Sequence, residues 1–347
     1  MTVPNLSPAR RPPAELAVDL GAAPPRAALA VGVAIVNWNR PQDTVECLDS
    51  LLQADPLPAR VVVVDNGSVD DSVARMEQWA EERGVPVHVE RAPDGAPGTD
   101  HRPPWLTVLA SETNRGFSGG NNVALRWLAA DARLGHFLLL NNDATVAADF
   151  FAEVAAALRE VPEAGLLSGT IYEFADRSRV WYAGGYEVPY RALVLHAYAV
   201  PASPAPVATE FICGCSMLIS RDAYRALGPL PECYDPAYSE DAEYSIRARK
   251  RGMPLVYAPR AAVYHKVGAT LGGSPFVVPR VAYLQNRNRV FYVRRNMRSW
   301  TRWIALSYLA ITKPGRAVVE ALAGRPAVAW AMLRGTATGF VSRAARR

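Results

Sequence analysis

Two runs of apolar, mostly β-branched residues, over Val31–Val36 and Arg60–Val64, most strongly constrain how this chain folds. Such runs are typical of strands buried on both faces, as in a parallel sheet covered by helices. A helical pattern opens at Pro41, directly after the first run. The alternation of strand and helix over short joints predicts an α/β fold with a mixed, mostly parallel sheet and helices on both faces.

Further elements continue this alternation. Ser68 and Asp71 have the spacing of a capping box and predict a helix over Val69–Arg83. A helix is also predicted after Ser239, and antiparallel strands are predicted between Leu166 and Ile219. The remaining predicted strands are Val85–Glu90, Trp105–Leu109, Phe137–Leu140, Leu255–Tyr257 and Ala262–Tyr264.

Charge divides the chain into unequal parts. The net charge is +5, but the segment from Pro279 onward holds 14 basic residues against the single acid Glu320 and therefore carries +13, which leaves −8 for the rest. We therefore expect a Pro/Ala-rich disordered leader at 1–28, a folded unit at 29–272 and a basic, amphipathic helical tail at 273–347. Such a tail predicts an anionic partner, either lipid or nucleic acid. No apolar run is long enough to predict a membrane-spanning helix.

The four cysteines, Cys47, Cys213, Cys215 and Cys233, do not have the spacing of a disulfide framework or a zinc site. We expect them to be reduced thiols that pack as small apolar residues.

Acids follow two of the predicted strands. Asp65 ends the second strand, and Asp143 closes the run Asn141–Asp143 after Phe137–Leu140. Open α/β sheets bind ligands beyond the carboxyl ends of their strands. Asp65 could accept hydrogen bonds from a nucleobase or ribose, and Asp143 could be a hard oxygen ligand for a divalent cation. Both stretches would also serve as ordinary turns.

Three other stretches allow both a chemical and a structural interpretation. The acids of Tyr238–Glu243 suit a helix N-terminus, yet a carboxylate there could be a general base. His265 could complete a metal shell or simply pack. The paired glycines of Thr113–Asn122 could let backbone N–H groups approach an anion or a sugar, or could form a tight packing turn.

Taken in order, six blocks resemble the inverting family 2 glycosyltransferases of GT-A fold, particularly rhamnosyltransferase-like and galactofuranosyltransferase-like members. The resemblance spans about Val31 to His265, and its blocks are Val33–Arg40, Val61–Ser68, Asn114–Asn122, Leu138–Asp143, Cys213–Ile219 and Tyr238–Arg247. It implies an enzyme that moves a sugar from a nucleotide-diphosphate donor to a hydroxyl of a glycan or lipid-linked acceptor in cell-envelope polysaccharide synthesis.

The resemblance also implies a role for each matching residue. Asp241 would be the general base, and Glu240 would contact the acceptor or the donor sugar. Asp143 and His265 would hold Mg²⁺ or Mn²⁺. The expected nucleotide-sugar contacts are Asn37, Asn39, Asp65, Asn114, Gly116, Gly119, Asn121 and Asn142. The metal block has an amide, Asn141, where such enzymes carry their first acid, so a catalytically silent sugar-nucleotide-binding or scaffold subunit is the alternative.

The tail adds a prediction about location. Basic residues are interleaved with aromatic ones such as Trp300 and Trp303, which suits an amphipathic segment in the headgroup region of a bilayer. A helical extension that packs on the folded unit is the alternative. No nucleic-acid module is recognisable, so we expect no nucleic-acid partner. The prediction is a cytoplasmic enzyme held peripherally on the inner face of the cell membrane.

Overall fold

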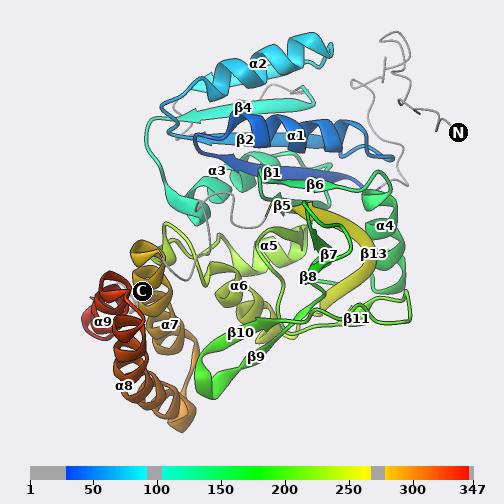
Figure 1. Cartoon of the computed structure of the whole chain (residues 1–347). Coiled ribbons are helices and arrows are strands. Elements are labelled where there is room, and N and C mark those ends of the chain that lie inside the picture. Colours follow the sequence, from blue (N-terminus) through cyan, green and yellow to red (C-terminus); the bar gives the residue numbers. More distant parts are fainter. Residues whose placement is uncertain (1–28, 92–103, 267–277, 344–347) are drawn as a thin grey trace, which may run out of the picture.

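The computed structural model describes residues 29–91, 104–266 and 278–343 (Figure 1). Its strands are β1 (Val31–Asn37), β2 (Arg60–Asn66), β3 (Val87–Arg91), β4 (Leu106–Ser111), β5 (His136–Leu140), β6 (Ala144–Val146), β7 (Leu166–Glu173), β8 (Val180–Tyr182), β9 (Gly185–Val188), β10 (Leu193–His196), β11 (Val207–Ala208), β12 (Ser216–Ser220) and β13 (Leu255–His265). Its α-helices are α1 (Pro41–Leu52), α2 (Ser72–Glu82), α3 (Gly116–Ala130), α4 (Phe150–Glu160), α5 (Arg221–Leu227), α6 (Glu240–Arg249), α7 (Pro279–Asn296), α8 (Ser299–Leu322) and α9 (Pro326–Val341), and two 3₁₀ turns are η2 (Pro189–Arg191) and η3 (Glu232–Tyr234).

One large mixed sheet runs through the described residues in the order β11-β13-β7-β12-β5-β1-β2-β4-β3. Strands β5, β1, β2, β4 and β3 are mutually parallel, whereas β12 runs antiparallel to both β5 and β7. Outside this order, β6 pairs with β13 and β8 pairs with β7. Strands β9 and β10 form a separate hairpin. The parallel half brings the ends of β1, β2 and β5 to one edge, as the sequence predicted.

Side chains of the central strands alternate between two apolar cores. Ile35 and Val63 contribute to the core under α1, α2 and α4, where Leu48 is fully buried. Ala34 and Val64 point to the opposite core, which α3 covers with side chains such as Leu128. Burial on both faces explains why these strands are continuously apolar in sequence.

Several element boundaries differ from the predicted ones. The capping box is wrong, because α2 begins only at Ser72 and its N-cap residue Asp71 makes no side-chain cap. The two strands predicted over 255–257 and 262–264 are a single strand, β13, with a register shift between Ala258 and Ala262. Pro259 lies in this bulge, where a residue without a backbone N–H is tolerated.

The C-terminal extension is helical, as predicted. Helices α7 and α9 pack closely, since a Cβ at Gly335 would lie 2.2 Å from the backbone oxygen of Tyr283. Figure 1 shows α7, α8 and α9 grouped beside α6 and the β9–β10 hairpin. No helix among the described residues has the length and apolar character needed to cross a membrane.

Candidate active site

The loops after β1 and β2 meet at the carboxyl end of the sheet. Asn37 lies beside Asp65 in register, and its Nδ2 donates to Asp65 Oδ1 at 2.7 Å. The Ser68 hydroxyl donates to the same oxygen at 2.5 Å and accepts the backbone N–H of Asn39 at 2.9 Å. Ser68 therefore orients a carboxylate instead of capping a helix. Asn37, Asn39 and Asp65 lie together in one network.

Asn39 has the backbone conformation that its position requires. Its φ of +52° lies in the left-handed region, which asparagine tolerates better than most residues. Its Oδ1 accepts the backbone N–H of Val69 at 2.8 Å and so ties the two loops together a second time.

The end of β5 joins this network through Asn142. Its Nδ2 donates to Thr44 Oγ1 at 3.1 Å and to Asn37 Oδ1 at 3.4 Å. The Thr44 hydroxyl also donates to Asn37 Oδ1 at 2.8 Å. Thr44 was not anticipated from the sequence, where it looks like one polar residue of an amphipathic helix.

Asp143 and His265 face each other beside Asn142. β13 pairs with β6 so that His265 lies opposite Ala144, and His265 Nε2 is 3.1 Å from Asp143 Oδ1. That oxygen is buried, and among the described residues no group other than the His265 imidazole lies within reach to donate a hydrogen bond to it. The two predicted metal ligands are therefore adjacent, and within the described structure the imidazole is the only partner of this buried carboxylate oxygen. No cluster of three or more His, Cys, Asp or Glu side chains suited to a metal occurs in the described ranges.

The turn before β12 connects this pair to the acids of α6. The backbone N–H of Asn141 donates to the Cys215 oxygen at 3.0 Å, and the N–H of Gly214 donates to Asp241 Oδ2 at 3.0 Å. Contiguous contacts thus run from Asp65 through Asn37 and Asn142 to the 213–215 turn and Asp241. The three acids, far apart in sequence, lie at one edge of the sheet.

Glu240 and Asp241 are the acids of α6 that form no ion pair with the described residues. Asp241 also accepts the N–H of Ala242 at 2.8 Å. Burial raises the pKa of Asp241, although its backbone hydrogen bonds oppose the rise. Burial, followed by the neighbouring Asp241 charge, raises the pKa of Glu240 well above its usual range, and Glu240 Oε2 is buried with no hydrogen-bond partner in the described structure.

The third acid of this helix start, Glu243, has a structural role. It accepts two hydrogen bonds from Arg295, at 2.7 and 2.8 Å, and one from the Tyr234 hydroxyl at 2.6 Å. Burial alone would raise the pKa of Glu243, but these donors lower it. The helix predicted after Ser239 is α6, but Ser239 has a φ of +79° and its side chain makes no cap hydrogen bond.

The glycine-rich stretch 113–122 braces the site from the side of α3. Asn114 Oδ1 accepts a hydrogen bond from the backbone N–H of Gly116 at 2.8 Å and another from Nδ2 of the Asn66 side chain at 3.1 Å. Asn121 is 2% exposed, and its Nδ2 donates to the backbone oxygen of Phe117 at 2.9 Å. Both amides therefore make internal contacts at the end of β2 and within α3.

In the described structure, a carboxyl group of the protein itself, that of Asp235, lies against these glycines. A Cβ at Gly116, whose φ is +70°, would lie 2.7 Å from the carboxyl group of Asp235. Ser118 N–H donates to Asp235 Oδ1 at 3.1 Å, and Gly119 lies next to the other carboxyl oxygen. Burial raises the pKa of Asp235 to about 7. No local pattern indicates this pairing, because Ser118 and Asp235 are 117 positions apart in the chain.

Lys266 and the cysteines complete the surroundings. Lys266 Nζ contacts Asp43 at 2.7 Å and Glu46 at 2.6 Å, which holds the end of β13 against α1. All four cysteines are free, as expected, and three of them, Cys47, Cys213 and Cys215, are buried.

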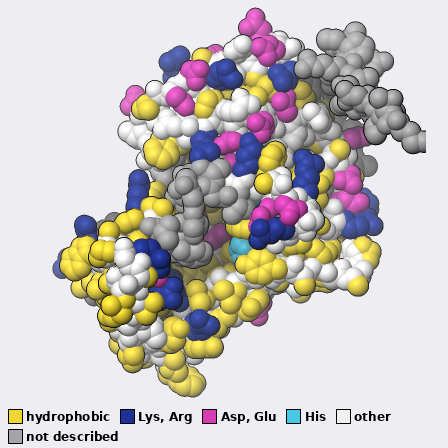
Figure 2. Space-filling model, in the orientation of Figure 1, with side chains coloured by type: hydrophobic (Ala, Val, Ile, Leu, Met, Phe, Trp, Pro, Cys, Tyr) yellow, Lys and Arg dark blue, Asp and Glu magenta, His cyan; other side chains and the backbone are white. Residues whose placement is uncertain are grey.

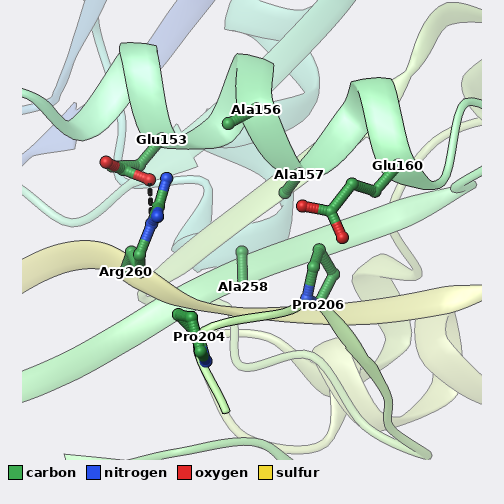
Figure 3. Close-up of a pocket in the computed structure, with 8 residues that line it drawn as sticks. All are labelled: Glu153, Ala156, Ala157, Glu160, Pro204, Pro206, Ala258 and Arg260. Atoms are coloured by element: carbon green, nitrogen blue, oxygen red, sulfur yellow. Dashed lines mark hydrogen bonds and ion pairs between the residues drawn. The ribbon is translucent and has the colours of Figure 1, made fainter.

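Two surface hollows lie away from this site. Figure 3 shows the smaller one, which lies between α4 and β13, where Arg260 pairs with Glu153 at 2.5 Å. The larger, about 480 Å³, is lined by the start of β13, by β11 and by Arg249. Neither includes a predicted site residue, so the acids at the sheet edge remain the candidate site.

Two family models match the sequence. The model of glycosyl transferase family 2 matches residues 32–228, more than half of the chain, and that of glycosyl transferase family group 2 matches residues 136–341. This chain belongs to glycosyl transferase family 2. The enzyme is therefore a glycosyltransferase, as the ordered blocks predicted. A search of curated proteins finds no match.

Solved structures confirm the GT-A fold. GalNAc-T7 with UDP, GalNAc and Mn²⁺ superposes with a TM-score of 0.56 at 16% identity, covering 77% of this chain and 48% of its own. Residues 1–349 of Staphylococcus aureus TarS give 0.53 at 16%, covering 91% and 82%. The Pyrobaculum calidifontis mannosyltransferase PcManGT with GDP-Man and Mn²⁺ gives 0.52 at 17%, covering 94% and 92%. The present chain therefore spans about half the length of GalNAc-T7.

Proposed function

We propose that this family 2 enzyme transfers a sugar from a nucleotide-diphosphate donor to an acceptor hydroxyl with inversion at the anomeric carbon. The observation that carries the proposal is the connected set of Asp65, Asp143 and Asp241 at the edge where the parallel strands end. The nucleotide sugars or nucleotides and Mn²⁺ bound to GalNAc-T7 and PcManGT support a donor and a metal of the same chemical class.

The donor nucleotide would bind at the loops after β1 and β2. Asp65 is held by Asn37 and Ser68, so its carboxylate is already oriented before a ligand arrives. A ribose hydroxyl or a base N–H could donate to it without reordering the loop. Asn39 and Asn142 border the same network and would contact the nucleotide and its diphosphate.

Asp143 and His265 fit a divalent cation. Their facing atoms are 3.1 Å apart, close to the spacing of two adjacent ligands that each lie about 2.1 Å from one ion. Within the described structure, Asp143 Oδ1 has no polar contact other than His265 Nε2. Mg²⁺ and Mn²⁺ complete their shells with water and substrate phosphates, so two protein ligands suffice. When bound, such an ion neutralises charge on the diphosphate leaving group.

Asp241 would be the general base. Its carboxylate, oriented by the N–H groups of Gly214 and Ala242, would take the proton of the acceptor hydroxyl. The acceptor oxygen forms a bond to the anomeric carbon as the bond to the diphosphate oxygen breaks. Glu240, with its free Oε2, would hold a hydroxyl of the acceptor or of the donor sugar.

The sugar itself is a narrower proposal. The resemblance to rhamnosyl- and galactofuranosyl-transferring members supports one of these donors, and a lipid-linked or glycan acceptor in cell-envelope polysaccharide synthesis. The amide at Asn141 leaves a single carboxylate in the metal block, and this feature favours the alternative of a silent binding subunit.

One screen tests both functions. Thermal shift of the purified protein is measured with UDP, GDP and thymidine diphosphate, with and without Mn²⁺, followed by donor turnover assays on any sugar nucleotide that stabilises it. We expect metal-dependent stabilisation that Asp143→Asn weakens and Asp241→Asn leaves intact, together with turnover by the wild type that Asp241→Asn lowers strongly. Stabilisation without any donor hydrolysis or transfer would favour the silent subunit, and no stabilisation by any nucleotide would refute nucleotide-sugar binding.

We also propose that α8 lies on an anionic membrane surface. Five side chains at helical spacing, each at least 42% exposed, form an apolar stripe along one face of the helix: Trp300, Ile304, Ile311, Val318 and Leu322. Figure 2 shows apolar side chains gathered over the C-terminal helices with basic ones among them. The net charge of +13 from Pro279 onward favours an anionic bilayer as the occupant of this stripe. A peripheral position on the inner face of the membrane would bring a lipid-linked acceptor to the enzyme.

A further inference from the structure

Helix α7 reaches the loop that leads into Glu240 and Asp241 of α6. Asn288 is fully buried, and its Nδ2 lies 2.8–2.9 Å from the backbone oxygens of Tyr234, Ala237 and Tyr238. These oxygens belong to residues 234–239, here named the pre-catalytic loop, which ends one residue before Glu240. A single side chain from the C-terminal extension thus binds three carbonyl groups of this loop.

Arg287 extends the same attachment. Its Nη2 donates to the oxygens of Tyr234 and Asp235, at 3.1 and 2.8 Å, and its Nε donates to Asn288 Oδ1 at 2.8 Å. The guanidinium group therefore holds the loop directly and also fixes the Asn288 amide so that its N–H groups face the loop. Arginine suits this role because its donors are fixed in one plane.

The pre-catalytic loop has a conformation that its own residues do not favour. Tyr238 and Ser239 have φ values of +80° and +79°, in the left-handed region that residues other than glycine adopt at an energetic cost. The Ser239 side chain does not cap α6. Because local sequence does not impose this geometry, contacts from outside the loop must maintain it.

α7 also holds the other side of the two acids. Arg295 forms its paired hydrogen bonds with Glu243, one turn beyond Glu240, and Asn296 Nδ2 donates to the same carboxylate at 3.0 Å. Glu240 and Asp241 therefore lie between two segments that are both attached to one helix. A shift of α7 would move them relative to Gly214, which binds Asp241.

We propose that Asn288, held by Arg287, is a positioning residue that keeps Asp241 and Glu240 aimed at the donor and acceptor. The proposal rests on the proposed function, in which Asp241 removes the acceptor proton. Asn288 touches no reacting atom in this mechanism and acts through the backbone of the pre-catalytic loop. The C-terminal extension then belongs to the catalytic machinery through α7, besides any role of α8 at a membrane.

The chain provides a matched control two residues away. Asn286 is also buried in α7, but the one hydrogen bond that its Nδ2 donates within the described residues goes to the Ala282 oxygen of its own helix. Asn288→Ala and Asn286→Ala make the same chemical change at similar depth. We expect Asn288→Ala to lower kcat about 10²-fold, the loss typical of a misplaced catalytic group, with little change in the donor KM. We expect Asn286→Ala to keep kcat within about threefold, with a smaller loss of thermal stability because the Asn286 Oδ1 that it removes has no hydrogen-bond partner in the described structure.

A second readout does not depend on activity. Hydrogen exchange at the buried Gly214 amide reports its hydrogen bond to Asp241 Oδ2. We expect faster exchange in Asn288→Ala than in Asn286→Ala, and partial recovery of both kcat and protection in Asn288→Gln. If Asn288→Ala does not fold, Arg287→Lys, which removes the planar fork, should show the same pattern at smaller amplitude.

The outcomes separate the two proposals. Equal kcat and equal Gly214 protection in the two alanine variants would overturn the positioning role. Faster Gly214 exchange in Asn288→Ala alone, in a protein that transfers no sugar from any donor tested, would support the attachment by α7 and refute the proposed glycosyl transfer.

Discussion

Asp241 is the residue on which the proposed chemistry depends most directly. Asp241→Asn keeps the size of the side chain and an oxygen that can accept the Gly214 N–H, but it removes the base. We expect turnover to fall about 10²–10⁴-fold, the usual contribution of general base catalysis. Steady-state rates and nucleotide binding should be measured together, because binding should be unchanged. A variant with near-normal turnover would contradict the assignment.

The pH dependence of turnover should reflect the raised pKa of Asp241. Because burial raises this pKa, the base is protonated at a higher pH than an ordinary aspartate. We expect kcat to fall as pH decreases through this raised value, so the acid limb of the profile should lie above the ordinary aspartate pKa of about 3.9. A kcat profile that is flat from neutral pH down to about 4 would argue against Asp241 as the titrating base.

Glu240 gives a prediction about stability. Its raised pKa means that the folded state favours the protonated carboxyl, so the stability that Glu240 contributes at low pH is lost as pH rises through its folded-state pKa. Glu240→Gln removes this loss and should raise the melting temperature near pH 8 by on the order of 2 °C, the shift that about 1 kcal/mol produces. The gain should shrink toward pH 4. Thermal melts of both proteins between pH 4 and pH 8 check this, and a gain that grows toward pH 4 would contradict the prediction.

At the scale of elements, the packing of α7 on α9 depends on glycine. A Cβ at Gly335 would lie 2.2 Å from the Tyr283 oxygen, whereas one at Gly315 in α8 would meet nothing within 4 Å. Gly335→Ala must push α9 away and should cost about 1–3 kcal/mol of unfolding free energy. Gly315→Ala makes the same change in open space and should gain about 0.5–1 kcal/mol. Urea unfolding of both variants checks the prediction, and equal effects would contradict it.

The elements also show what could be predicted from the sequence. Val31–Val36 and the Asp65 and Asp143 strand ends followed from hydrophobic pattern, because a strand buried on both faces leaves a continuous apolar run. Parallel pairing then brought both acids to one edge. The family blocks supplied Asp241 and His265, which periodicity alone could not distinguish from a helix start and a packed imidazole.

What the sequence missed depends on contacts between distant residues. Ser68 fits a capping box locally, but in the fold its hydroxyl contacts Asp65 and Asn39, so the cap was wrong. Asn288 looks like one polar residue among many in a basic helix, and only the arrangement of α7 against residues 234–239 gives it a role. Its partners are 50–54 residues away, so no short motif could indicate them.

At the scale of the whole molecule, the charge asymmetry and the exposed stripe of α8 lie on the same extension that holds the pre-catalytic loop. α7 turns inward to residues 234–239 and Glu243, while α8 presents Trp300, Ile311 and Leu322 outward. If α8 rests on a bilayer, the helix that positions the base is joined directly to the one that meets the membrane. A lipid-linked acceptor would then be presented to a site whose geometry depends on the same extension.

Flotation with vesicles tests this arrangement. Replacing Trp300, Ile311 and Leu322 with Ser removes the most apolar part of the stripe and leaves every basic residue in place. We expect the wild type to float with vesicles that contain phosphatidylserine, to bind neutral phosphatidylcholine vesicles more weakly, and to lose binding as salt rises, since each basic residue near the surface contributes about 1 kcal/mol. The triple variant should lose most binding to either vesicle, because the apolar face supplies the buried area.

The matched control replaces Tyr198, which is 65% exposed but lies outside the extension, with Ser, and it should float like the wild type. Nucleotide binding should be equal in all three proteins, because the stripe does not touch the β1 and β2 loops. Sedimentation of the wild type in the absence of lipid tests the alternative that the stripe binds a second copy of the protein. If the stripe instead drives pairing with a second copy, the wild type sediments as a dimer that the triple variant abolishes, and neither protein floats.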